Sequence, residues 1–130
     1  MSSALVVRIV CPVRVGATRE DSLRALVKVV HDLNRQFLRH NPQTPALYRS
    51  GVIYQREPRA IREEFATIPA VISQGWGDCD DLAPWRSAEL AEVHGVDAWP
   101  DVVSVRPGLF HIIVRRADGR TEDPSRVLGM

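Results

Sequence analysis

The sequence predicts an α+β protein that forms a single domain over residues 1–130. Helical periodicity fills the first part of the chain and strand-like segments fill its end, which is the order of an α+β fold. The chain has 130 residues, of which 45% are hydrophobic, so it is long enough to bury one core and too short for two. It contains no internal repeat, low-complexity tract or linker.

Charge and apolar runs exclude several classes of protein. Seventeen basic and sixteen acidic residues give a formal net charge of +1, which provides no field for nonspecific binding of nucleic acid or of a membrane surface. The apolar run from Ala4 to Val7 is interrupted by Arg8 and is too short for a signal-peptide core or a membrane span. We therefore expect a cytoplasmic protein with no membrane insertion and no nucleic-acid partner. The two cysteines, Cys11 and Cys79, have no metal-type spacing, and we expect both thiols to be reduced.

The first expected element is a strand from Leu5 to Val15. β-Branched residues dominate this segment, and Pro12 marks a bulge, an edge or the end of the strand. Cys11 is expected to pack there.

A long amphipathic helix is expected next, with Thr18 as its N-cap and Asn41-Pro42 at its end. Its apolar residues recur at helical spacing: Leu23, Leu26, Val27, Val30, Leu33 and Phe37. Two histidines, His31 and His40, fall off this apolar face, so we expect both to lie in solvent.

Residues 41–75 are less regular, because prolines at positions 42, 45, 58 and 69 divide them into short segments. We expect loops and short helices, with Arg59 to Phe65 and Ile68 to Ser73 each forming a helical turn or two. A second long helix is expected after Cys79 and ends at Gly95, which suits a residue just beyond a helix C-terminus. Because proline is comfortable only in the first turn, Pro84 makes this helix begin near Asp80 or Asp81, or bend if it begins at Cys79.

The candidate nucleophile is Cys79, which lies where a glycine-rich turn runs into this second helix. The unpaired N–H groups and the positive end of the helix dipole favour a thiolate, the form of cysteine that attacks carbonyl carbon. Asp78, Asp80 and Asp81 can cap the same helix end, but their charges raise the pKa of a neighbouring thiol. Thiolate formation at Cys79 therefore requires a cationic histidine or a bound cation.

The candidate base is His111, which lies among apolar residues in a strand-like segment. A buried structural histidine is the alternative interpretation. The chain then turns at Ala117-Asp118-Gly119 and returns through Asp123. A two-residue loop would place Asp123 on the face opposite His111. A three-residue loop with Gly119 in the left-handed region would pair Arg116 with Arg120 and face His111 toward Ser125, leaving Asp123 a diagonal neighbour about 7–8 Å away. Glycine suits that third position, so we predict the three-residue loop.

Three short motifs together carry a family resemblance. They are Gly77-x-Cys79-x-Asp81-x-Ala83 before a helix, His111 opening a strand, and Asp123-Pro124. In this order they resemble the core of the transglutaminase-like cysteine peptidases. The Gly-Asp-Cys-Asp-Asp form, preceded by Glu63-Glu64-Phe65 and followed by a helix and Gly95, looks most like the bacterial transglutaminase-like cysteine proteinases. The resemblance covers residues 60–126, about half of the chain.

The resemblance implies a papain-like α+β core, in which the cysteine-bearing helix packs on an antiparallel sheet that carries the histidine and the aspartate. Cys79 would attack an amide carbonyl of a protein or peptide, His111 would move the proton, and Asp123 would orient the imidazole, with a thioester intermediate. The Cys79 N–H would bind the oxyanion together with the side chain of Gln74 or Trp76.

In some bacterial members of this family, acidic residues beside the cysteine bind calcium, and the matching positions here are Asp78 and Asp80. The reaction itself requires no cofactor. Two carboxylates fall short of the six to eight oxygens that calcium takes, and helix capping accounts for both residues without a metal. Calcium is therefore an optional ligand in this interpretation.

Other functions stay open at this point. An amine-accepting transglutaminase is disfavoured, because the chain has no room for the extra domains of the animal enzymes. A papain-like cell-wall amidase also has an Asp-Cys pair at a helix start, but usually with a histidine as third residue and a longer Cys-to-His interval. The third alternative is a non-catalytic interaction domain of phage or prophage origin that binds a partner through Trp76, Trp85 and Trp99. Oligomeric state is not predicted.

Overall fold

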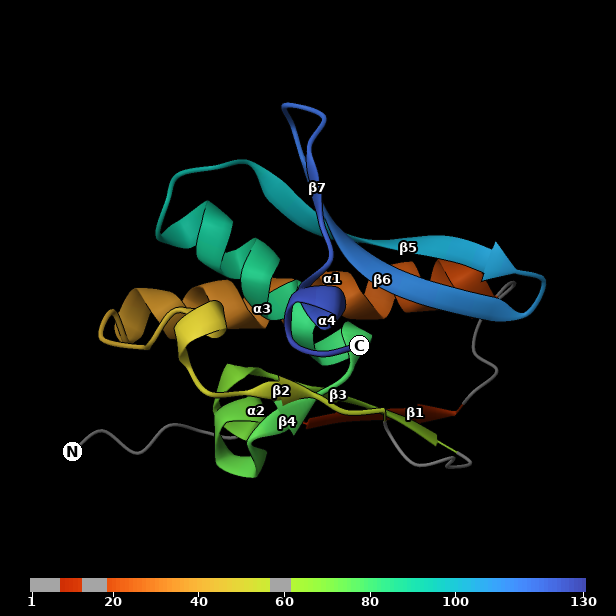
Figure 1. The fold of residues 1–130 in the computed structure, drawn as a ribbon, viewed down its shortest axis with the longest axis horizontal. Helices are drawn as coiled ribbons and strands as arrows, with labels where there is room; N and C mark the ends of the chain where they lie inside the picture. The colour runs from red at the N-terminus through yellow and green to blue at the C-terminus, as the bar shows by residue number, and fades with distance from the viewer. Residues whose placement is uncertain (1–7, 13–18, 57–61) are drawn as a thin grey trace.

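The computed structural model describes residues 8–12, 19–56 and 62–130, with the backbone alone for 8–12 and 62–63. Helices and strands are mixed, and the largest sheet is antiparallel, which confirms the predicted α+β class. Figure 1 shows this sheet and α1 above the small strand pairs, with α3 crossing α1 on its way up from the strand pairs. None of the described helices has the length and apolarity needed to cross a membrane.

The predicted first strand and first helix are both present. β1 (Arg8–Pro12) ends at the proline, and α1 (Arg19–His40) ends directly before Asn41. The outer ends of the predicted strand, and Thr18 as N-cap, lie outside the described residues, as does the side chain of Cys11.

One predicted helical turn is wrong. The residues of Arg59–Phe65 that the structure describes belong to strand β3 (Arg62–Ala66), which pairs antiparallel with β1. Pairing with a strand some fifty residues earlier in the chain overrides local preference here, and Phe65 and Ala66 become fully or nearly fully buried in the core.

Besides β3, four short elements lie between α1 and the second long helix. They are the 3₁₀ turn η1 (Leu47–Arg49), β2 (Ile53–Tyr54), α2 (Ile68–Gln74) and β4 (Trp76–Gly77). The helix predicted over Ile68 to Ser73 is therefore confirmed. β2 and β4 pair in parallel, which brings residues of the irregular region next to the glycine-rich turn before Cys79.

The second long helix, α3 (Cys79–Glu92), begins at Cys79 and retains Pro84 in its interior. It contacts α1, the strands β5 and β6, and the short C-terminal helix α4. Ten of its fourteen residues are buried, so almost no face is left to solvent. A helix enclosed in this way belongs to the centre of the core.

The antiparallel sheet has the order β5 (Ala98–Arg106), β6 (Leu109–Arg116), β7 (Thr121–Glu122). β6 and β7 are joined by the predicted three-residue loop: the Arg116 N–H donates to the Arg120 carbonyl at 2.9 Å, and Gly119 has φ +88°. β7 ends earlier than predicted, because helix α4 (Pro124–Val127) follows at once.

Within the described part of the chain, buried side chains form two hydrophobic clusters, and α3 contributes to both. The first lies between α1, α3 and the sheet and comprises Leu23, Val27, Val30, Phe65, Ala83, Leu90, Ala98, Val102, Ile112 and Val114. The second lies toward α2 and η1 and comprises Leu38, Leu47, Val52, Ala66, Ile68, Ala70, Val71, Leu82, Trp85 and Ala88.

The prediction that His31 lies in solvent is wrong, whereas His40 is exposed as predicted. His31 retains 6% of its surface, and its Nδ1 is hydrogen-bonded to Ser87 Oγ of α3 at 2.6 Å. The physical reason is that α3 covers a wider stripe of α1 than the apolar residues mark, so polar side chains at the edge of the stripe are buried as well.

Candidate active site

The glycine-rich turn places Cys79 as the first residue of α3, with Asp78 as the N-cap. Gly75 ends α2 in the left-handed region, with φ +83°. Gly77 lies against the first turn of α3, where an added Cβ would come within 3.0 Å of Leu82 and 3.2 Å of Asp81. Both glycines are therefore needed to bring the chain into α3 at this angle.

His111 and Asp123 form a direct pair. His111 Nε2 lies 3.0 Å from Asp123 Oδ1 and 2.9 Å from Oδ2. Asp123 makes this contact as the N-cap of α4 rather than from within a strand, since β7 stops at Glu122. The carboxylate fixes the Nε2 side of the imidazole ring, so Nδ1 is the nitrogen that can exchange a proton with another group.

Cys79 lies beside the strand that carries His111. The Ile112 backbone N–H, one residue after the histidine, hydrogen-bonds to the sulfur. Asp123 lies close enough for its charge to act on the same thiol. Among the described hydrogen bonds, none joins the sulfur to the imidazole ring. Such a contact is commonly long in the absence of substrate and tightens when a substrate is bound.

The thiol of Cys79 is not ionised at rest. Burial, followed by the charge of Asp78, raises its pKa to about 12, while the Ile112 N–H acts in the opposite direction. Asp81 and Asp123 add to the increase. The carboxylates thus oppose ionisation, as the sequence indicated, and a base must remove the proton during the reaction.

Three carboxylates form an acidic cluster at the start of α3. Ligand oxygens of Asp78, Asp80 and Asp81 lie within 4.8 Å of one another. Asp81 accepts the Ala66 N–H at 2.7 Å and the Asp78 N–H at 3.3 Å, so it serves as a structural cap.

The other two carboxylates of the acidic cluster are less well compensated. Asp78 Oδ1 and Asp80 Oδ1 are buried without a hydrogen-bond partner among the described residues. Burial, together with the neighbouring carboxylates, raises the pKa of Asp80 well above its ordinary value. Two orphaned oxygens fit one side of a cation's coordination shell but do not form a complete calcium site.

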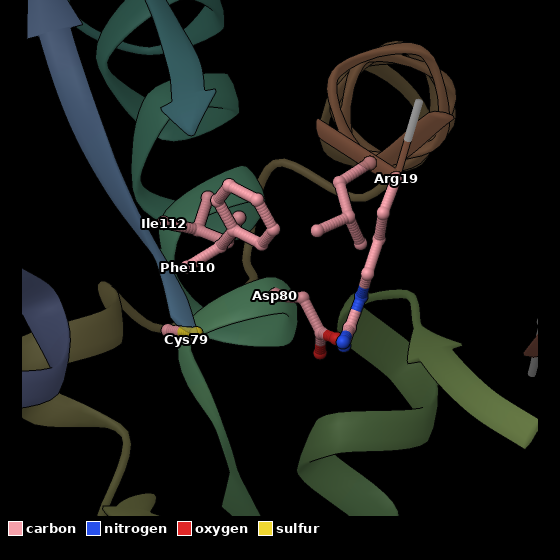
Figure 2. A pocket seen from close by; sticks show the side chains of 6 residues that line it. Arg19, Cys79, Asp80, Phe110 and Ile112 are labelled. Carbon is pink, nitrogen blue, oxygen red and sulfur yellow. The ribbon is translucent and has the colours of Figure 1, made fainter. Parts of the chain in front are cut away.

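A small pocket of about 60 Å³ opens beside Cys79. Leu23, Phe110 and Ile112 form its apolar walls, and Arg19 and Asp80 form its polar end. Figure 2 shows the Arg19 side chain extending from α1 toward the Asp80 carboxylate. The apolar walls exclude water from one side of Cys79, in agreement with the raised pKa of its thiol.

The two predicted oxyanion donors precede Cys79 in the chain and lie next to each other. The Gln74 side-chain amide donates to the Trp76 carbonyl at 2.7 Å. Gln74 therefore supports the turn in this structure. The backbone N–H of Cys79, at the first position of α3, is one of the donors that a helix leaves without an intrahelical acceptor.

Sequence reasoning missed Tyr54. It lies on β2 opposite Gly77, and its phenol lies near Cys79 and close enough to Asp78 and Asp123 to feel their charges. Burial and these charges raise the pKa of the phenol, so it remains a hydrogen-bond donor at neutral pH. No local signal marks this residue, because only the β2–β4 pairing brings it to the site.

Trp85 also differs from the role considered for it. Its side chain is fully buried in the second hydrophobic cluster, whereas Trp99 keeps 40% of its surface exposed. The three tryptophans therefore do not form a common binding surface.

Comparison of the chain with models of protein families, with curated proteins and with solved structures finds no match. Its function is therefore argued from its own geometry.

Proposed function

We propose that this protein is a thiol-dependent amide hydrolase, a cysteine peptidase that acts through Cys79, His111 and Asp123. The observation that carries the proposal is the pair of contacts of 2.9 Å and 3.0 Å between His111 Nε2 and Asp123, on the strand that also contacts the Cys79 sulfur. Acyl transfer by a cysteine requires an imidazole oriented by a carboxylate and a thiol at a helix N-terminus, and here the strand that carries the imidazole lies next to that thiol.

The proposed architecture is papain-like. α3 carries the nucleophile at its N-terminus and packs on the antiparallel sheet, whose strand β6 carries the base. The residue that orients the base follows β7 directly. The nucleophile and the base are thus carried by separate elements, α3 and the central strand β6, which pack against each other.

In the proposed reaction, the Cys79 sulfur attacks the carbonyl carbon of an amide while His111 Nδ1 takes the thiol proton. The C–N bond then breaks, the proton passes from Nδ1 to the leaving amine, and a thioester remains on Cys79. Water adds to the thioester with His111 as base, which releases the acid and restores the thiol. Because the thiol pKa is raised to about 12, proton transfer accompanies the attack instead of preceding it.

The oxyanion of this reaction forms next to the N-terminus of α3. The Cys79 N–H is one donor by its position. Gln74 and Trp76 are two candidates for the second donor. The Tyr54 phenol is another candidate for the same role, because it stays protonated near the sulfur. Each donor lost at such a position typically lowers kcat by about 10²–10³-fold.

Alkylation of Cys79 tests the proposal. In a Cys11→Ser background, the rate of reaction with iodoacetamide is followed between pH 5 and 10 by mass spectrometry. We expect the parent to react faster near neutral pH than a thiol of pKa about 12 allows, and His111→Ala to remove the excess. His40→Ala is the matched control, because this exposed histidine lies on α1.

A parent protein that reacts no faster than His111→Ala would favour the non-catalytic interaction domain, since the high thiol pKa is the one observation that supports an inert cysteine. Turnover of peptide amides, with and without a fluorescent primary amine, then separates hydrolysis from transfer to an amine. Hydrolysis yields a carboxylic acid, whereas transfer yields an amide of the fluorescent amine.

We also propose that a cation, calcium in the first place, binds at Asp78 and Asp80, whose orphaned oxygens it would satisfy. Such an ion would neutralise part of the charge that raises the thiol pKa. Millimolar calcium is expected to raise the Tm of the parent, and chelator to reverse the increase. In Asp80→Asn, calcium should have no effect on Tm. An unchanged Tm in the parent would leave the carboxylates as helix caps only.

A further inference from the structure

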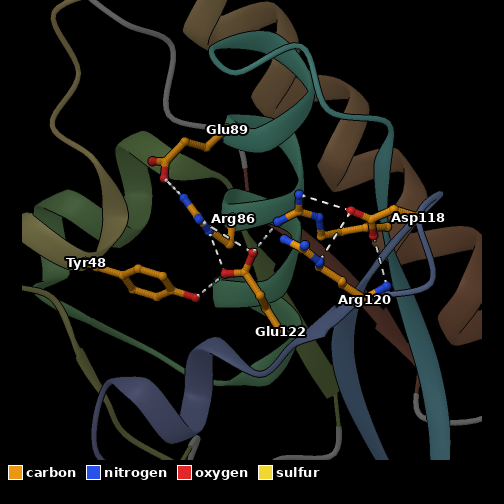
Figure 3. A network of polar contacts seen from close by, with 7 residues as sticks. Tyr48, Arg86, Glu89, Asp118, Arg120 and Glu122 are labelled. Atoms are coloured by element: carbon orange, nitrogen blue, oxygen red, sulfur yellow. Dashed lines mark hydrogen bonds and ion pairs between the residues drawn. The ribbon is translucent and has the colours of Figure 1, made fainter.

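A polar network on α3 ends at the residue that precedes Asp123 in the chain. Glu122 and Asp123 are neighbours with different partners: Asp123 binds His111, whereas Glu122 binds Arg86 of α3 and Tyr48 of η1. Figure 3 shows Tyr48 and Arg86 converging on the Glu122 carboxylate.

Arg86 forms the centre of this network. Its Nε donates to Glu122 Oε1 at 2.9 Å and its Nη1 donates to Glu89 Oε1 at 2.7 Å, with a longer contact of 3.5 Å from Nη2 to Glu122 Oε2. The guanidinium carbon lies 4.8 Å from the centre of the Tyr48 ring. The side chain of Arg86 keeps only 17% of its surface exposed, so solvent screens these charges less than it screens surface pairs.

The carboxylates that Arg86 binds are themselves anchored. Glu89 accepts the Leu47 backbone N–H at 2.9 Å, and Glu122 accepts the Tyr48 hydroxyl at 3.0 Å. The Arg86 guanidinium is therefore held by a carboxylate on each side and by the Tyr48 ring on one face. A guanidinium fixed in this way provides direction as well as charge, which an ammonium group cannot reproduce.

The elements around Asp123 are too short to hold it by themselves. β7 has two residues and α4 has four, and one turn of helix does not persist without tertiary contacts. Longer elements hold this segment: α3 packs against α4, Arg116 of β6 pairs with Glu122 at 3.8 Å, and Arg86 of α3 contacts Glu122 at 2.9 Å. Arg86 lies two turns after Cys79, so the same helix carries the nucleophile and the clamp.

We propose that Arg86 is a positioning residue: it holds Glu122, and through the next peptide unit it sets Asp123 against the His111 imidazole. The inference rests on the proposed function for its purpose, since a fixed Asp123 is needed only if His111 must be oriented. Its physical content, the dependence of the His111–Asp123 contact on Arg86, can be measured without any substrate.

The test follows the His111 Nε2–H proton by NMR of protein labelled with ¹⁵N-histidine. In the parent, we expect a downfield, slowly exchanging signal from the hydrogen bond to Asp123. Arg86→Met should abolish the signal. Arg86→Lys and Glu122→Gln, which retain volume and disturb the fold least, should both weaken it, and all three variants should slow Cys79 alkylation by on the order of tenfold or more.

Two controls separate positioning from general loss of stability. Glu92 lies on α3, like Arg86, and pairs with Arg35 and Arg39 of α1 at 3.0 Å and 2.8 Å. Glu92→Gln weakens these two pairs and leaves the contacts of Asp123 in place. Val27→Ala removes methyl groups from a fully buried side chain in the first hydrophobic cluster. Both should retain the signal. Circular dichroism verifies that each variant is folded at the temperature used.

The outcomes distinguish this inference from the proposed function. A signal that keeps its parental position and intensity in folded Arg86→Lys and Glu122→Gln overturns the positioning role, whatever the activity. A signal that weakens in these variants supports the positioning role, even if the His111→Ala variant is alkylated as fast as the parent and the hydrolase proposal fails.

Discussion

At the residue scale, the charge of Asp78 is the largest electrostatic influence on Cys79 after burial. Asp78→Asn should keep the N-cap, because asparagine caps helices as well as aspartate does, and should remove the charge. The thiol pKa is then expected to fall, and alkylation at pH 8 in the presence of chelator to become faster. Asp97→Asn, at an exposed aspartate far along the chain, is the control. An unchanged pH profile would mean that burial alone sets the pKa.

A second prediction at this scale concerns His31. Burial lowers its pKa from the ordinary value of 6.5, so the unfolded chain takes up a proton at a higher pH than the folded one does. Stability is therefore complete above pH 6.5 and falls as the pH decreases through 6.5 toward the lower folded-state value. Urea unfolding at pH 8 and pH 5.5 should show this loss in the parent and in His40→Gln. In His31→Gln the loss should be smaller, and an equal loss would assign it to other groups.

Sequence reasoning reached the His111–Asp123 pair because a local rule decided it. Glycine at position 119 selects the loop, the loop sets the register, and the register puts Asp123 on the side of His111. Tyr54 and Arg86 have no such rule. Their places depend on pairs far apart in sequence, such as β2 with β4 and α3 with β7.

At the scale of elements, the turn before α3 depends on the missing side chain of Gly77. Gly77→Ala should cost about 1–3 kcal/mol, because the new methyl group meets the fully buried Leu82. It should also slow Cys79 alkylation by moving the first turn of α3.

Gly51→Ala is the matched control for this turn. Gly51 has φ +83°, and no described residue lies within 4 Å of its added Cβ, so the substitution should cost about 1 kcal/mol through backbone strain and leave Cys79 unchanged. Urea titration gives both free energies of unfolding. Equal alkylation rates in Gly77→Ala and the parent would argue against a steric role for this glycine.

The elements that the sequence predicts well are those with their own start and stop signals. α1 ends before Asn41-Pro42, and α2 follows Thr67 and ends at Gly75. β3 failed because its Arg-Glu-Glu sequence has helical preference, and the strand exists only through β1. Pro84 inside α3 is tolerated because buried contacts on nearly all sides compensate for the missing N–H.

At the scale of the whole molecule, α3 joins the two hydrophobic clusters. Ala83 and Leu90 belong to the first, and Leu82, Trp85 and Ala88 belong to the second. Neither cluster can lose its contacts without exposing a face of the same helix. The predicted single domain should therefore unfold in one cooperative step.

This cooperativity can be measured with one variant in each cluster. Val27→Ala and Val71→Ala each truncate a fully buried valine, at an expected cost of about 2 kcal/mol. Tryptophan fluorescence, to which Trp85 of the second cluster contributes together with Trp76 and Trp99, and alkylation of Cys79, which packs against the first cluster, should give the same urea midpoint in both variants. Separate midpoints in Val71→Ala would indicate two folding units.

The hairpin loop at Ala117, Asp118 and Gly119 has a consequence for how this protein can change. All three residues are exposed, and substitution of Ala117 should be harmless, whereas Asp118 accepts the Arg120 N–H at 2.9 Å and pairs with Arg116 at 3.3 Å. The number of residues in the loop is constrained, because one inserted residue would shift β7 by one position against β6. Glu122 would then turn toward His111, and its neighbour toward Arg86. The loop thus tolerates substitution at Ala117 but is fixed in length, and an insertion there should abolish activity where an Ala117 substitution does not.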